Sequence, residues 1–182
     1  VGWLEQEHPY VRGQASPAVI DRFAELLQTQ GTHFPAGCLG LHTCSLCPDA
    51  PDAHRVIPPY THRNGRRISL GTTNLFVPGN GVVYVAPSLA LHYMVEHEYL
   101  PPQEFCDALL SCPPIGSAEY YRLFEQNGPA CWREWARRRC DRELREGSSS
   151  SGIRLPPFVC GTPRVGCRIL LPWGMIVDEN SA

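Results

Sequence analysis

The pattern of apolar and polar positions predicts helices packed beside one short β-hairpin. Residues 73–77 and 82–85 are rich in β-branched and aromatic side chains, and residues 78–81 between them have the composition of a tight turn. We therefore expect a strand, a turn and a second strand. Pro87 suits the first turn of a helix, and Pro101-Pro102 prevents that helix from continuing. This order favours an α+β fold.

Further helices are predicted on both sides of the hairpin. Ser16-Pro17 supplies a cap and a first-turn proline for a helix that continues to about Gln28. Another helix is expected from Pro102 until Pro113-Pro114, and Ser117 is a suitable cap for a third, short helix. The apolar side chains of the first helix share one face, as expected if that face is buried: Val19, Ile20, Phe23, Leu26 and Leu27.

Residues 48–67 show neither helical nor strand periodicity, and they contain several prolines and a glycine. We interpret this segment as a loop. It carries a small group of basic residues: Arg55, His62, Arg63, Arg66 and Arg67. Groups of this size usually belong to a solvated loop, so contact with nucleic acid is not the favoured interpretation.

The amino-acid composition of the chain changes near Cys131. An arginine-rich helix is predicted from Trp132 to Arg145, and residues 147–152 resemble a glycine-serine linker. We expect a zinc-stabilised α+β domain over residues 1–127. Residues 128–182 would then form the arginine-rich helix and an irregular, low-complexity tail that is poorly folded.

Two residue pairs carry the candidate chemistry: Cys44-x2-Cys47 and His92-x4-His97. Zinc binds two thiolates and two imidazoles in tetrahedral geometry, and these two spacings are typical of structural sites. The order of cysteine pair, hairpin and helix is that of a ββα zinc finger, although Cys47 and His92 are further apart than in a compact finger. We expect Cys44, Cys47, His92 and His97 to hold one Zn²⁺ ion.

The helix geometry sets a condition on this site. Residues five apart on an ideal helix are rotated by about 140° from each other, so His92 and His97 converge only if the last turn loosens. A plainer interpretation also stays open: the cysteines behave as small buried hydrophobic residues, and the histidines cap the helix or face solvent.

A second ligand set is possible within a short stretch of chain. Cys38 and His42 could join Cys44 and Cys47 in a compact cluster. We rank this set second, because it would fold little chain around itself. In the favoured set, His42 is a neighbour that forms hydrogen bonds near the metal, and Cys38 is buried or unliganded.

Composition excludes some catalytic chemistry and indicates the cellular compartment of the protein. All sixteen basic residues are arginine, which excludes a lysine Schiff base and a phosphate-loop lysine. The nine cysteines form an odd set, and the chain has neither a secretory leader pattern nor an apolar stretch long enough for a membrane span. We therefore expect a cytoplasmic protein in a reducing compartment, with no membrane association.

Several motifs together resemble a family of uncharacterised bacterial proteins. They are Gly2-Trp3-Leu4 with His8-Pro9-Tyr10, the His42-x-Cys44-x2-Cys47 element, and the run from Val83-Tyr84-Val85-Ala86-Pro87 through His92-Tyr93 to His97-x-Tyr99-x-Pro101-Pro102-x-Glu104-Phe105. The resemblance covers roughly residues 2–127. It implies a bacterial source and a shared fold, places the cysteine and histidine pairs in one unit, and assigns no activity.

A site filled by four side chains leaves no coordination position for water, so we expect a structural zinc and no catalytic residues. The favoured function is a non-enzymatic protein-interaction domain of a binding or immunity type, with another protein as partner and any small-molecule substrate unknown. A metal-dependent hydrolase is the alternative, and it would need an open site and Glu96 or Glu98 as base. Cys106 as a nucleophile is disfavoured, because it lies on the apolar face of a helix.

A nucleic-acid-binding zinc module is the third interpretation. The finger-like order and the arginines favour it. The formal net charge of −2 argues against it, because such domains usually present a basic surface to the phosphates.

Overall fold

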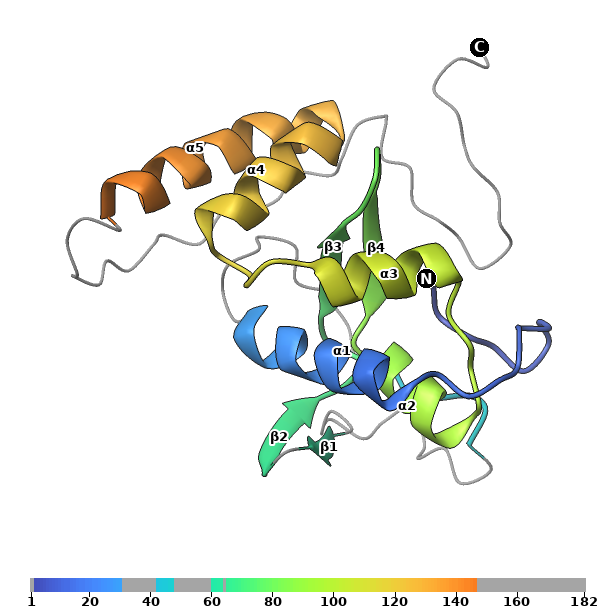
Figure 1. Ribbon diagram of the computed structural model, residues 1–182. Helices are drawn as coiled ribbons and strands as arrows, with labels where there is room; N and C mark the ends of the chain where they lie inside the picture. The colour runs from blue at the N-terminus through green and yellow to red at the C-terminus, as the bar shows by residue number, and fades with distance from the viewer. Residues whose placement is uncertain (1, 31–41, 48–59, 64, 147–182) are drawn as a thin grey trace, which may run out of the picture.

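The computed structural model describes residues 2–30, 42–47, 60–63 and 65–146. The elements follow in the order α1 (Pro17–Gln30), β1 (Tyr60–Arg63), β2 (Arg66–Ser69), β3 (Asn74–Pro78), β4 (Val83–Pro87), α2 (Ala90–Glu96), α3 (Gln103–Ser111), α4 (Ala118–Asn127) and α5 (Ala130–Glu146). Figure 1 shows α1 and α3 crossing the β3–β4 hairpin, with α4 and α5 beyond one end of it and α2 near the other. The predicted α+β fold with packed helices is confirmed, and the described residues contain two small antiparallel hairpins where the sequence predicts one.

The β3–β4 hairpin forms where the sequence predicts it, except that Pro87, expected in the first turn of the next helix, is the last residue of β4, and α2 begins at Ala90. The strands pair antiparallel with Phe76 opposite Val85. The Gly79 amide donates a hydrogen bond to the Val82 carbonyl oxygen at 2.8 Å and closes the turn. Gly81 has φ of 70°, a left-handed conformation that glycine adopts without steric cost.

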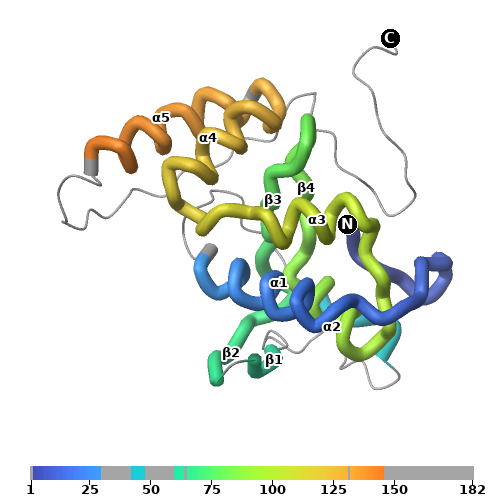
Figure 2. The backbone as a smooth tube through the Cα atoms, in the orientation of Figure 1, coloured from blue at the N-terminus to red at the C-terminus, as the bar shows by residue number. Residues whose placement is uncertain are grey.

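Both faces of β3 are buried in the core. Leu75, Phe76 and Val77 are all buried, and successive strand residues point to opposite faces, so neither face of β3 is left to solvent. Helices α1, α3 and α4 contact β3. Phe23 of α1 and Phe105 of α3 meet edge to face with ring centroids 6.3 Å apart. The tube in Figure 2 follows the same crossing of α1 and α3 over the strands.

Helix α1 begins at the predicted position. The Ser16 hydroxyl accepts a hydrogen bond from the Val19 amide at 3.3 Å, as expected of an N-cap. Val19, Phe23 and Leu26 are buried at helical spacing. The predicted apolar face is confirmed, and the helix extends two residues beyond Gln28.

The prediction of a loop as far as residue 67 is wrong where the structure describes it, because β1 and β2 form an antiparallel hairpin there. Its signal is weak in the sequence, since the side chains of these strands are mostly polar and exposed and only Ile68 is buried. Arg67 stacks over the Tyr60 ring at 4.1 Å, and Arg63 pairs with Asp21 of α1 at 2.6 Å. Part of the basic group is therefore engaged within the fold.

Helices α4 and α5 form an antiparallel pair that packs at one end of the core (Figure 1). Aromatic side chains make many of the contacts at this end. The Ser117 cap is confirmed, because its hydroxyl accepts from the Tyr120 amide at 3.1 Å. On α5, Ala136 and Cys140 are buried, and Trp132 packs edge to face on Phe76 with centroids 5.4 Å apart. The division of the chain at residue 127 stays a prediction, and the tail from residue 147 lies outside the described residues.

Candidate metal centre

Two separate segments bring four metal-binding side chains together. Cys44 and Cys47 lie in the segment 42–47, which contains neither helix nor strand. His92 lies on α2, and His97 is the residue that ends this helix. The sulfur and ring nitrogen atoms of the four residues all lie within 4.8 Å of one another, so this group could hold a metal ion.

The distances within the group are short and similar. The Cys44 Sγ lies 3.2 Å from the His97 Nε2, and the Cys47 Sγ lies 3.3 Å from the Nε2 atoms of both His92 and His97. The two Nε2 atoms are 3.1 Å apart. All four donor atoms therefore converge on one point in space, as the ligands of a single ion would.

The end of α2 meets the geometric condition that the spacing of the histidines imposes. The backbone of His97 has left the helical region, with φ −123° and ψ 15°. Glu98 follows with φ of 52°, and the Tyr99 amide donates to the Tyr93 carbonyl oxygen at 3.0 Å. The last turn is thus loosened as predicted, and this allows His97 to converge on His92.

The cysteine segment is held against the chain that precedes β3. The His42 amide donates to the Gly71 carbonyl oxygen at 3.0 Å. Gly71 has φ of 74°, and a Cβ atom there would fall against the His42 carbonyl oxygen, well inside van der Waals contact. Only glycine fits this approach without displacing the backbone two residues before Cys44.

The N-terminal segment supports the histidines from the other side. Tyr10 donates its hydroxyl hydrogen bond to the His97 carbonyl oxygen at 3.1 Å. The Glu98 carbonyl oxygen accepts from the Gly13 amide at 2.8 Å, and Arg12 forms a β-bridge with Tyr99. These contacts fix the backbone at the point where the helix ends and His97 turns inward.

Burial and charge suit neutral imidazole ligands. Cys44 is buried, whereas Cys47, His92 and His97 are half-buried. Burial lowers the pKa of His92, the neighbouring His97 lowers it further, and Glu96 opposes both. His92 is therefore held in the neutral form that binds metal.

The structure separates the other candidates from this group. His42 is exposed and stacks on Trp3, with ring centroids 4.0 Å apart, and it does not belong to the group. The second ligand set is not assembled from the residues described, and Cys38 lies outside them. Cys106 is buried on α3, and burial, with a contribution from Asp107, raises the pKa of its thiol, which disfavours a nucleophilic thiolate.

Sequence reasoning missed the residues that position the ligands. Tyr10 and Tyr93 appeared only within the motifs of a family resemblance, and Gly71 gave no signal at all. Gly71 and His42 lie far apart in sequence, so no spacing rule connects them. Burial raises the pKa of Tyr93 well above its ordinary value, and the nearby Cys44 contributes. Its hydroxyl faces the Leu4 carbonyl oxygen at 3.5 Å.

A family model described as "Domain of unknown function (DUF7919)" matches residues 1–110. The chain belongs to this family. The DUF7919 match confirms the resemblance to a family of uncharacterised proteins, and its range contains all four residues of the metal group. No curated protein and no solved structure matches the chain.

The DUF7919 range also contains the residues that hold the group in place, from Tyr10 to Gly71 and Glu98. Helices α4 and α5 lie beyond its end at residue 110. Within the described residues, no helix combines the length and the apolar composition that crossing a membrane requires.

Proposed function

We propose that Cys44, Cys47, His92 and His97 bind one structural zinc ion, and that the domain is a non-enzymatic protein-interaction module. The convergence of the four donor atoms carries this proposal. Zn–S bonds of ~2.3 Å and Zn–N bonds of ~2.05 Å in a tetrahedron place two nitrogens ~3.3 Å apart and a sulfur and a nitrogen ~3.6 Å apart. The observed N–N distance of 3.1 Å and S–N distances of 3.2 to 3.3 Å lie within a few tenths of an ångström of these values.

The ligand types favour zinc over harder cations. Magnesium and calcium take oxygen ligands, whereas two thiolates and two imidazoles are a typical zinc set. Two thiolates and two neutral imidazoles also cancel the double charge of the ion, which suits a half-buried site. The proposal keeps the cytoplasmic setting expected from the sequence, where thiols stay reduced.

The same set favours a structural role over hydrolysis. A tetrahedral ion with four protein ligands has no position for a water molecule, and the side chains of Glu96 and Glu98 are exposed. The ion would instead fix the segment 42–47 against α2. We infer that zinc shapes a surface for a partner protein, and we retain a binding or immunity-type role as the favoured function.

The first test is stoichiometric. Elemental analysis of purified protein should find one zinc per chain, and Cys44→Ser or His97→Ala should abolish or sharply weaken its retention. Cys106→Ala is the matched control, because it removes a buried thiol outside the group and should leave zinc content unchanged. Full retention in the Cys44→Ser and Cys47→Ser variants would end the assignment.

A second test separates a closed site from an open one. Cobalt-substituted protein should show the visible absorption of tetrahedral cobalt with thiolate ligands. Added azide should leave this spectrum unchanged, because the protein fills every coordination position. A spectrum that changes with azide would show an exchangeable position and favour the hydrolase.

A further inference from the structure

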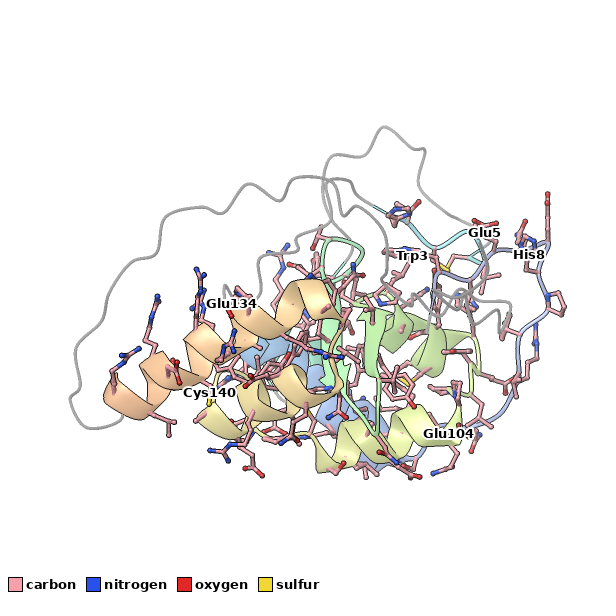
Figure 3. The ribbon with its side chains drawn as sticks, turned by 90° about the horizontal axis from the view of Figure 1, so that it is seen from above. Trp3, Glu5, His8, Glu104, Glu134 and Cys140 are labelled. Carbon is pink, nitrogen blue, oxygen red and sulfur yellow. The ribbon has the colours of Figure 1, made fainter. Side chains whose placement is uncertain are left out.

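A hollow of about 360 Å³ lies beside the metal centre. Trp3, His42 and Tyr93 are among its lining residues, of which Tyr93 is almost fully buried, and Thr43 and Ser45 come from the cysteine segment. Figure 3 shows Trp3, Glu5 and His8 together at one edge of the molecule, away from Glu134 and Cys140 on α5. The hollow is therefore a feature of the metal end and is separate from the arginine-rich helix.

The aromatic part of the hollow is flat. The rings of Trp3 and His42 stack with centroids 4.0 Å apart and an interplanar angle of 23°. Trp3 is half-buried, whereas His42 is exposed. The two rings already cover one face of each other, so another planar group that enters from solvent stacks on an outer face of the pair, and the exposed ring is that of His42.

Among the described residues that line the hollow, the charged ones are acidic. Glu5 and Glu7 are among its lining residues, and both are exposed. The His8 Nδ1 lies 3.4 Å from the Glu5 carboxylate. Phosphate groups would be repelled here, whereas a cation would be attracted.

We propose that this hollow binds an arginine side chain of a partner protein. A guanidinium group is planar and always charged, it stacks on aromatic rings, and it forms paired hydrogen bonds with a carboxylate. The stacked rings of Trp3 and His42 supply the first partner and Glu5 and Glu7 supply the second. The inference rests on the proposed protein-interaction function and deepens it by naming the chemistry of the partner.

The position of the hollow links this binding to the metal. Thr43 and Ser45 flank Cys44, and Tyr93 follows His92, so four-fold coordination fixes three of the lining residues. The zinc-loaded protein therefore presents a formed hollow. Removal of the ion frees these three lining residues to move, so arginine binding should disappear when the ion is removed.

The test uses acetyl-arginine-amide as the probe and the indole N–H signal of Trp3 as the readout, on full-length zinc-loaded protein. Acetyl-citrulline-amide is the uncharged analogue of the same shape. Acetyl-lysine-amide carries the positive charge but has no planar guanidinium group. The Trp3 signal should shift most with arginine, less with lysine and least with citrulline. The arginine response should weaken as salt is raised, because the charges are exposed.

A matched pair of variants tests the role of charge. Glu7→Gln should weaken arginine binding by about threefold or more, as expected for the loss of one exposed ion pair. Glu104→Gln removes another exposed carboxylate, on α3, and should not change the binding.

The outcomes separate the two proposals. Protein that carries no zinc contradicts the proposed function before the titration begins. Zinc-loaded protein whose Trp3 signal is unmoved by arginine, or moves equally with citrulline, overturns the arginine site alone. An equal effect of Glu7→Gln and Glu104→Gln overturns it as well.

Discussion

The surroundings of Phe124 are packed aromatic rings, whereas the surroundings of the His97 side chain are thiol sulfur and imidazole nitrogen atoms that converge on one point. Phe124 is fully buried, and its ring centroid lies 5.7 Å from that of Trp132 and 5.6 Å from that of Trp135. At the other end, His97 is only half-buried and its nearest neighbours are two thiols and a second imidazole.

The two ends differ in what stabilises them. Packed aromatic side chains lower the free energy of the folded state without any added component. Once both thiols ionise, the two thiolates of Cys44 and Cys47, whose sulfur atoms lie within 4.8 Å of each other, repel one another unless a cation lies among the four side chains. One end of the fold is therefore stabilised by burial, and under the proposed zinc assignment we expect the other end to depend on the ion.

Removal of the metal should produce the largest difference in stability between the two ends. Structural zinc contributes an apparent ~10–16 kcal/mol in small finger peptides, against a net stability of ~5–15 kcal/mol for a whole domain. A strong chelator should therefore unfold at least the segment from Cys44 to His97 and lower the thermal midpoint and the near-UV dichroism. Hydrogen exchange should rise first in α2 and later in α4. An unmoved midpoint would contradict a structural role for the ion.

The complementary change removes a ring from the other end. Phe124→Ala should lower the free energy of unfolding by about 3–5 kcal/mol, because it leaves a cavity between α4 and α5. Zinc content should stay at one per chain under native conditions. Leu144→Ala is the matched control on α5, since this side chain is 57% exposed and its loss should cost little. Urea titrations and elemental analysis measure both quantities, and zinc loss in Phe124→Ala would show that the ends are not independent.

The sequence predicts which four side chains come together at the candidate metal centre better than it predicts the residues that support them. Cys44, Cys47, His92 and His97 follow spacings that zinc chemistry imposes, so they are recognisable without a structure. The β3–β4 hairpin and α1 are also recognisable, because their buried residues recur at the period of the element. The β1–β2 hairpin is not, since Ile68 is its one buried residue and its other side chains are polar or charged.

Contacts between distant segments explain the rest of what the sequence leaves open. Tyr10 reaches the His97 carbonyl oxygen across 87 positions of the chain, and the His42 amide reaches Gly71. Local propensity carries no information about either pair. The hollow beside Trp3 and His42 is another product of tertiary packing and has no signature in the spacing of its residues.

Gly71 offers a way to disturb the metal end through the backbone alone. Gly71→Ala places a methyl group against the His42 carbonyl oxygen and forces a left-handed conformation on a side chain. Gly81→Ala imposes the same conformation, with φ of 70°, where nothing lies within 4 Å. The control should therefore cost about 1–2 kcal/mol and the Gly71 variant about 1–3 kcal/mol more. Only Gly71→Ala should also weaken zinc binding in a competition with a chelating dye, and equal losses would show that the His42 contact does not position Cys44.

Glu98 provides the smallest and most selective test of how the metal end is built. Its φ of 52° is unfavourable for any residue with a Cβ atom, and its carbonyl oxygen is fixed by the Gly13 amide at 2.8 Å. Glu98→Gly relieves the local strain, while the greater freedom of the unfolded chain offsets part of the gain, so the free energy of unfolding should rise by up to about 1 kcal/mol. Glu98→Val should lower it, because a β-branched side chain tolerates this conformation least. Chemical denaturation of the zinc-loaded variants measures the difference. A clear loss of stability in Glu98→Gly would contradict this account, because it would mean that the left-handed conformation of Glu98 is not a source of strain.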